Sequence, residues 1–260
     1  MKGRFDYELN INDFSPISKL EKLEILDVSK TNISDISFLE NNKNMKELYL
    51  HSGWISIKLN INNFSPLYKL EKLEVLKISG TKISDISFIE KNKSLKELYL
   101  NGCDYIQNFN PISKLDKLEI VEVCCTKIFD ISFIENNKNL KKLRLSGDTG
   151  IILNIKDFRP ISKLEKLEIL DVNNTNISDI SFLVANKNLK NLYLNGCENI
   201  KDFSPISKLG NLEELLVART NISDVTFLEN NKFLKQLSIS DCKNINKNDI
   251  ENKRKDLFIY

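Results

Sequence analysis

The sequence has few of the residues that carry metal or nucleophilic chemistry. It contains one histidine and five cysteines in 260 residues. The cysteines are odd in number and lack the paired spacing of a zinc site or a disulfide framework. Cys124 and Cys125 are adjacent, but two neighbouring thiols cannot form a tetrahedral site alone, and no histidine lies near them in sequence. The eight glycines are scattered and form no phosphate-binding loop. We therefore expect no enzymatic activity, no catalytic residue, no metal and no cofactor.

Long apolar runs and a strong net charge are also absent. No stretch approaches the ~20 apolar residues that span a bilayer, and the first residues contain no apolar core of a secretory signal. Basic and acidic residues number 38 and 36, for a net charge of +2, which is too small to hold a nucleic-acid backbone or an anionic membrane. The basic cluster at 253–255 is expected to be a solvated tail. These absences predict a cytoplasmic, intracellular protein with no nucleic-acid or membrane partner.

What the sequence does contain is an internal repeat. Its five prolines lie about 45 to 50 residues apart, each in a near copy of Phe-Ser-Pro-Ile-Ser-Lys-Leu. Each long module holds two units of about 22 residues, reading Leu-x-x-Leu-x-Val-x-x-Thr and Leu-x-x-Leu-x-Leu-x-x-Cys. Matching units begin at Leu23, Met45, Leu73, Leu95, Leu118, Leu140, Leu167, Leu189, Leu212 and Leu234. We expect a short N-terminal cap at 1–22 and a partial last repeat at 245–260.

This pattern resembles the leucine-rich repeats, and the resemblance covers nearly the whole chain. Within that family, the spacing and the phrase Asn-Ile-Ser-Asp-Ile-Ser-Phe-Leu at 32–39 resemble the bacterial internalins and the phosphatase-regulatory solenoids. The resemblance implies an α/β fold: a right-handed, horseshoe-shaped solenoid with a parallel sheet on its concave side and short helical or 3₁₀ turns on its convex side. It implies one such domain over 1–260.

Elementary physical chemistry supports the same fold. The Leu-x-Leu alternation has a period of two, which suits a short strand with one buried face. Ser15 can cap the helical turn that follows, and Pro16 suits its first position. One unit buries too few apolar side chains to offset the entropy of ordering its residues, so successive units must stack.

Several repeated columns are expected to be structural. Two phenylalanine columns should fill the convex half of the core. Cys103, Cys197 and Cys242 alternate with a threonine column and should point inward and bond to backbone. A recurring aspartate could suggest a calcium ladder, but a turn or cap role explains it better. Its members are Asp35, Asp85, Asp130, Asp179 and Asp224.

Two units are longer than the others, and each addition contains a Leu-Asn-Ile triplet. The triplets lie at 59–61 and 153–155, and a third copy lies at 9–11 near the N-terminus. We expect the additions to bulge on the convex side and the first copy to cover the N-terminal end of the core. A secondary binding site at the additions is the alternative.

The concave face is the expected binding surface, because residues between the buried leucines of a strand point to solvent. Tyrosine and arginine are enriched at protein interfaces, and the central column carries both, with Lys77, Glu122 and Asp171 as orienting charges. The alternative is that these residues were copied with the repeat and bind nothing. The candidate partner-binding residues are Tyr49, Lys77, Tyr99, Glu122, Arg144, Asp171 and Tyr193.

The sequence thus predicts a non-enzymatic interaction module that binds a protein partner on its concave sheet. One alternative is a structural solenoid that self-associates through its C-terminal end, because 257–260 is apolar and sheet edges pair readily. A second is a substrate-recognition or regulatory subunit of a larger complex.

Overall fold

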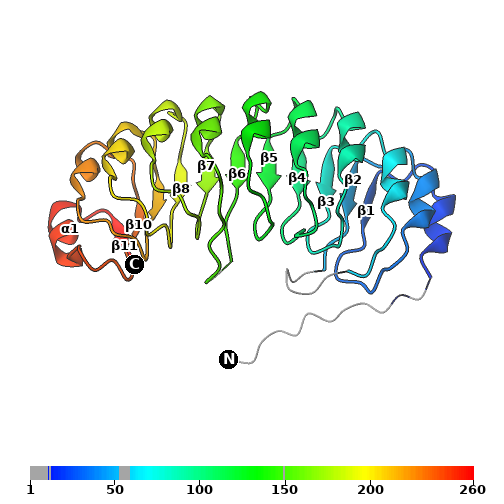
Figure 1. Cartoon of the computed structure of the whole chain (residues 1–260), viewed down its shortest axis with the longest axis horizontal. Coiled ribbons are helices and arrows are strands. Elements are labelled where there is room, and N and C mark those ends of the chain that lie inside the picture. Colours follow the sequence, from blue (N-terminus) through cyan, green and yellow to red (C-terminus); the bar gives the residue numbers. More distant parts are fainter. Residues whose placement is uncertain (1–10, 12, 53–58, 149) are drawn as a thin grey trace. The chain divides into compact units, whose positions relative to one another are not determined.

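In a computed structural model, residues 11, 13–52, 59–148 and 150–260 are described. The chain divides into two compact units, Met1–Lys127 and Ile128–Tyr260. Strands and 3₁₀-helices (η) alternate along each unit (Figure 1). Among the described residues, no helix has the length and apolar character needed to cross a membrane.

The first unit is a parallel sheet in which each three-residue strand pairs with the next. The pairing keeps every central leucine or valine in line, as Leu26, Leu48 and Leu76 are. Successive 3₁₀-helices pack side by side on the other side of the core. The elements are η1 (Ser15–Lys19), β1 (Ile25–Asp27), η2 (Ser37–Asn41), β2 (Glu47–Tyr49), η3 (Ser65–Lys69), β3 (Val75–Lys77), η4 (Ser87–Lys91), β4 (Glu97–Tyr99), η5 (Asn110–Lys114) and β5 (Ile120–Glu122).

The second unit repeats this plan and ends in a short α-helix. Its last strand pairs in parallel with the strand before it, placing Ile259 opposite Leu237. The elements are η6 (Ser132–Asn136), β6 (Lys142–Arg144), η7 (Arg159–Lys163), β7 (Ile169–Asp171), η8 (Ser181–Ala185), β8 (Asn191–Tyr193), η9 (Ser204–Lys208), β9 (Glu214–Leu216), η10 (Thr226–Glu229), β10 (Gln236–Ser238), α1 (Lys247–Lys253) and β11 (Phe258–Ile259). The expected leucine-rich-repeat solenoid is therefore confirmed, whereas the partial last repeat stays a prediction. The single domain over 1–260 stays a prediction.

The expected core columns are confirmed, with exceptions among the phenylalanines. Seven of the ten column phenylalanines are buried, whereas Phe14, Phe64 and Phe182 are only partly covered. Phe14 stacks on Phe38, with ring centroids 5.9 Å apart.

The threonine and cysteine column bonds to backbone as the sequence predicts. Thr31 Oγ1 donates to the carbonyl of Val28 at 2.8 Å. Cys103 Sγ and Cys197 Sγ reach carbonyls of the preceding rung at 3.2 and 3.1 Å. Each side chain therefore closes its own turn or ties it to the rung before.

The 3₁₀-helices begin differently from the prediction. Ser15 is not the cap: Phe14 holds that position without a side-chain bond, and Asp13 Oδ1 accepts the N–H of Ser15 at 2.8 Å. The aspartate column plays the same part, since each of its members accepts the N–H two residues further on. Its turn role is confirmed, and proline lies in the first turn of η1, η3, η5, η7 and η9 as predicted.

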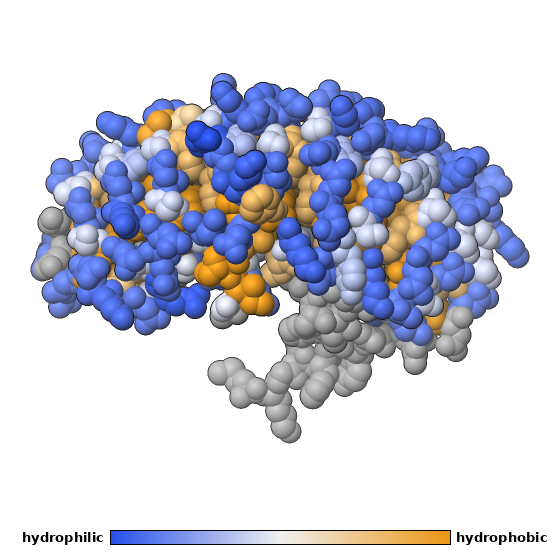
Figure 2. Space-filling view, in the orientation of Figure 1, coloured by the Kyte–Doolittle hydropathy of each residue, from blue (hydrophilic) through white to orange (hydrophobic). Residues whose placement is uncertain are grey.

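The long units also differ from the prediction. Leu59 and Leu153 form parallel bridges to Thr81 and Thr175 of the next rung. Ile61 and Ile155 are buried in the core, so the triplets are not bulges on the convex side. In the second unit the addition projects after β6 instead (Figure 1), and its Ile151 and Ile152 are exposed. Exposed apolar side chains also appear as orange atoms among the polar surface in Figure 2. Leu9 and Asn10 of the third copy lie outside the described residues, as do 53–58.

The basic cluster at 253–255 is not simply a solvated tail. Arg254 donates to the carbonyl oxygens of Asn231 at 3.2 Å and Leu234 at 2.9 Å, and it forms an ion pair with Asp256 at 2.8 Å. Its guanidinium therefore satisfies backbone acceptors at the last turns of the second unit.

Candidate functional site: the outward face of the sheet

The expected concave face corresponds to the outward side of each unit's sheet, here called the sheet face. Because strand side chains alternate, the first and third residues of every three-residue strand lie on the sheet face. The residue two positions after the strand's last residue also lies on this face, as His51 does after β2. In the first unit, register places Lys77 between Tyr49 and Tyr99 on neighbouring strands. In the second unit, Asp171 lies between Arg144 and Tyr193 in the same way.

Each sheet-face tyrosine of the first unit is held by a carboxylate on its own strand. Tyr49 Oη donates to Glu47 Oε2, and Tyr99 Oη donates to Glu97 Oε2, both at 2.8 Å. The bond to Glu47 raises the pKa of Tyr49 to about 12, helped by burial and by nearby negative charge. Burial, and then the bond to Glu97, raise the pKa of Tyr99. Both phenols therefore stay protonated donors, with their rings fixed and partly exposed.

Lys77 lies against one of these rings. Its Nζ is 5.3 Å from the centroid of the Tyr99 ring, which is a cation–π distance. The predicted residues Tyr49, Lys77 and Tyr99 thus form one continuous surface.

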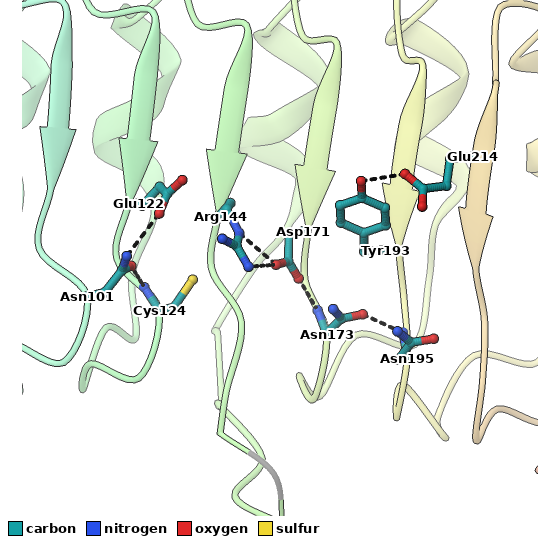
Figure 3. A network of polar contacts seen from close by, with 9 residues as sticks. All are labelled: Asn101, Glu122, Cys124, Arg144, Asp171, Asn173, Tyr193, Asn195 and Glu214. Carbon is teal, nitrogen blue, oxygen red and sulfur yellow. Dashed lines mark hydrogen bonds and ion pairs between the residues drawn. The ribbon is translucent and has the colours of Figure 1, made fainter. Parts of the chain in front are cut away.

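Glu122 differs from the exposed orienting charge that the sequence predicts. It is buried, and its Oε2 accepts a bond from Asn101 Nδ2 at 2.9 Å (Figure 3). Asn101 Oδ1 accepts the N–H of Cys124 at 2.9 Å. Glu122 therefore helps order the turns that follow the strands.

Asp171 is also buried, and only 1% of its surface is exposed. Arg144 covers it, with Nε and Nη2 both 2.8 Å from Asp171 Oδ2 (Figure 3). Asp171 Oδ1 accepts the N–H of Asn173 at 3.1 Å. The Asp171 carboxylate is therefore engaged in bonds within the chain, whereas 38% of the Arg144 side-chain surface is exposed.

Tyr193 is held by the neighbouring strand because its own strand carries Asn191 where the first unit has glutamate. Its Oη donates to Glu214 Oε2 at 2.6 Å (Figure 3). Asn191 Nδ2 donates to the same oxygen at 2.6 Å. Burial, and then Glu214, raise the pKa of Tyr193 to about 12. The sheet-face tyrosine is again a fixed donor.

The strand pattern predicts the tyrosines but not the residues that hold them. Glu47, Glu97 and Glu214 fix the three phenols, and Asn101 orders the turns. The signal was present as a Glu-x-Tyr phrase at 47–49 and again at 97–99.

The side chains on the sheet face are suited to noncovalent binding. In the part of the chain that the structure describes, no group of three or more histidine, cysteine or acidic residues could hold a metal. The face offers phenols, aliphatic side chains and charged groups, which suit packing and hydrogen bonding.

Known proteins share both the repeat and the fold. A family model described as leucine-rich repeats in two copies matches residues 71–120 and 165–208. The internalin InlF from Listeria monocytogenes is 25% identical with a TM-score of 0.78, over 96% of this chain and 70% of that one. The chain therefore contains leucine-rich repeats and has their fold. Internalin C2 from the same bacterium is 25% identical with a TM-score of 0.66, over 78% of this chain and 84% of that one. The internalin-like leucine-rich-repeat fold is a non-enzymatic interaction scaffold.

Solved structures of lower sequence identity share the fold alone. The plant peptide hormone receptor RGFR1, solved in complex with RGF2, is 20% identical with a TM-score of 0.64, over 97% of this chain and 46% of that one. No curated protein matches this chain in sequence.

Proposed function

We propose that this leucine-rich-repeat protein is an interaction module whose sheet face binds a protein partner. The observation that carries the proposal is the fixed geometry of the tyrosines. Tyr49, Tyr99 and Tyr193 present partly exposed rings, while bonds to carboxylates hold their hydroxyls. A binding surface that is already ordered loses little side-chain entropy on association.

The relatives support the same role. The structural neighbours include a plant receptor in complex with its peptide hormone. Regular strands also hold side chains more rigidly than loops do, which favours a defined binding surface.

The test is removal of two rings from the sheet face. Tyr99→Ala combined with Tyr193→Ala should reduce capture of the cognate protein from the native cell about tenfold or more, because buried interface tyrosines each contribute about 2 kcal/mol. The circular dichroism should not change. Tyr105→Ala is the matched control, because Tyr105 is 51% exposed and lies in a turn outside the strands. Equal capture by the double variant and the wild type would refute the sheet face as the site.

Self-association is the second candidate, and the last strand favours it. Among the described residues β11 pairs with β10 alone, and Phe258 and Tyr260 are 64% and 44% exposed. An unpaired strand edge can pair with another copy. Light scattering of the purified chain would show a dimer or larger species if this is correct, and a monomer if it is not. The regulatory-subunit role and the cytoplasmic location stay predictions.

A further inference from the structure

The sheet face of the first unit is acidic although the chain as a whole is slightly basic. Its outward residues on β1–β5, together with the residue two positions after each of these strands, include four carboxylates and one lysine. Burial lowers the pKa of His51 below its ordinary value, so that this side chain is uncharged at neutral pH. The net charge of the whole chain is +2, so this surface has the opposite sign. The carboxylates are Asp27, Glu47, Glu97 and Glu122, and the lysine is Lys77.

Two of these carboxylates are partly exposed. Glu47 and Glu97 each accept a phenol hydrogen bond, and neither forms an ion pair within the described part of the unit. A phenol donates to a carboxylate without cancelling its negative charge. The negative charges of Glu97 and Asp27 act on the Tyr49 phenol and contribute to the rise in its pKa.

The charges beside the strands do not neutralise the face. Lys46 pairs with Glu24 at 2.9 Å, and Lys96 pairs with Glu74 at 2.7 Å. Each of these lysines directly precedes its strand and is already matched by its own glutamate.

Lys77 demonstrates how a cation fits this surface. It stands between the two tyrosine-bearing strands in register, and its ammonium lies 5.3 Å from the Tyr99 ring centroid. An amine on this face therefore finds both a ring and negative charge, the two features that favour cations at aromatic sites.

The second unit lacks this arrangement. Its Arg144 and Asp171 neutralise each other. Asn191 replaces the glutamate of the Glu-x-Tyr phrase, and Tyr193 and Asn191 share the single carboxylate of Glu214. The acidic character is therefore specific to the first unit and is not a general consequence of the repeat.

We propose that the sheet face of the first unit binds a basic, extended segment of the partner protein, with lysine or arginine side chains against the Glu47–Tyr49 and Glu97–Tyr99 pairs. This inference rests on the proposed function and names the chemistry of its partner. The two pairs lie on β2 and β4, two strand spacings or about 9.6 Å apart. A polyproline II segment rises about 3.1 Å per residue with three residues per turn, so every third side chain recurs on one face after about 9.3 Å. The segment should carry basic residues three positions apart.

The test uses the full chain and a fluorescent peptide of four Lys-Ala-Pro repeats. The peptide should bind, and its affinity should fall with salt, because surface charge pairs are screened. Glu47→Gln combined with Glu97→Gln should weaken binding at least tenfold. Glu40→Gln combined with Glu90→Gln is the matched control: it makes the same charge change in the same unit, on η2 and η4 instead of the sheet, and should bind like the wild type.

Two further peptides separate the possible failures. A peptide with glutamate in place of lysine should not bind, and one with its lysines gathered at one end should bind more weakly. Equal binding by the wild type and the Glu47→Gln, Glu97→Gln variant would overturn the proposal, and so would equal binding of the acidic peptide. If the lysine peptide fails to bind while Tyr99→Ala with Tyr193→Ala still abolishes partner capture, the basic specificity is wrong and the proposed function stands.

Discussion

A buried asparagine provides the sharpest test of how the rungs are held together. Asn186 is fully buried at the end of η8. Its Nδ2 donates to the carbonyl oxygens of Ile161 and Leu164, both at 3.0 Å and both in the turn of the preceding rung. Asn42 and Asn231 make the same pair of bonds in their own rungs. The column thus ties one turn to the next.

Asn186→Asp replaces the donating NH2 group with a carboxyl oxygen and leaves the size and shape of the side chain almost unchanged. An ionised carboxylate would place an oxygen against two carbonyl oxygens in the core, so the new carboxyl should stay protonated. Holding an aspartic acid neutral at pH 7 costs about 4 kcal/mol, at 1.36 kcal/mol per unit above an ordinary pKa of about 3.9. One of the two hydrogen bonds is also lost, which adds about 1 kcal/mol. The expected loss of unfolding free energy is about 5 kcal/mol at pH 7.

The sign of the pH dependence is distinctive. The folded-state pKa of the new carboxyl lies above its unfolded value, so the stability of the variant falls as pH rises above about 4. At pH 5 the deficit should shrink to about 2.5 kcal/mol, since one pKa unit corresponds to 1.36 kcal/mol. Urea denaturation followed by circular dichroism at the two pH values measures both figures.

Asn188→Asp is the control, two residues away. Asn188 is exposed and makes one bond, from Nδ2 to the carbonyl of Glu165 at 2.8 Å. Its replacement should cost about 1 kcal/mol or less, with little pH dependence. Two results would show that the buried asparagine column does not stabilise the fold. One is a loss below 1 kcal/mol for Asn186→Asp at pH 7, and the other is a stability deficit that does not shrink at pH 5.

Two further predictions concern the turns that follow the strands. A side chain on Gly147 would overlap the backbone carbonyls of Ile151 and Asn174, so Gly147→Ala should lower the unfolding free energy by about 2 to 3 kcal/mol. Gly210→Ala, which enters open space, should stay within about 0.5 kcal/mol of the wild type; similar urea midpoints for both would contradict this packing. Burial lowers the pKa of His51 below 6.5, so the unfolded state binds the proton more readily and stability should decline as pH falls below about 6.5. His51→Gln should reduce that decline between pH 7.5 and 5.5, and an unchanged pH profile would show that His51 does not cause it.

Much of the fold could be predicted because its signals are local and repeated. Leu48 and Leu76 occupy the same place in a short phrase, so a period of two identifies both strands. The inward Thr31 and the turn-forming Asp35 likewise bond within a few residues of themselves. Patterns of this range are visible in a sequence without knowledge of which rungs are neighbours.

The features that the sequence did not reveal depend on contacts between rungs. Asn186 and Asn188 are indistinguishable in an Asn-Lys-Asn phrase, yet one is buried and the other exposed. Arg254 caps carbonyls 20 to 26 residues away. Asp171 is buried because Arg144, on the neighbouring strand, lies over its carboxylate. The sequence pattern of one strand cannot show that a side chain of another strand buries its residues.

The candidate site was predicted in part for the same reason. The outward tyrosines follow from the strand pattern, but the carboxylate that holds Tyr193 lies on the next strand, at Glu214. The acidic surface of the first unit also arises from several rungs together, so no single repeat displays it.

The central claim is that the partner lies on the sheet face, and side-chain footprinting of the complex tests it most directly. Hydroxyl-radical labelling of the chain, with and without its captured partner, is read by mass spectrometry at single tyrosines. We predict protection of Tyr49, Tyr99 and Tyr193, with Tyr105 labelled equally in both states. Protection of Tyr105 with undiminished labelling of the three sheet-face tyrosines would contradict the claim.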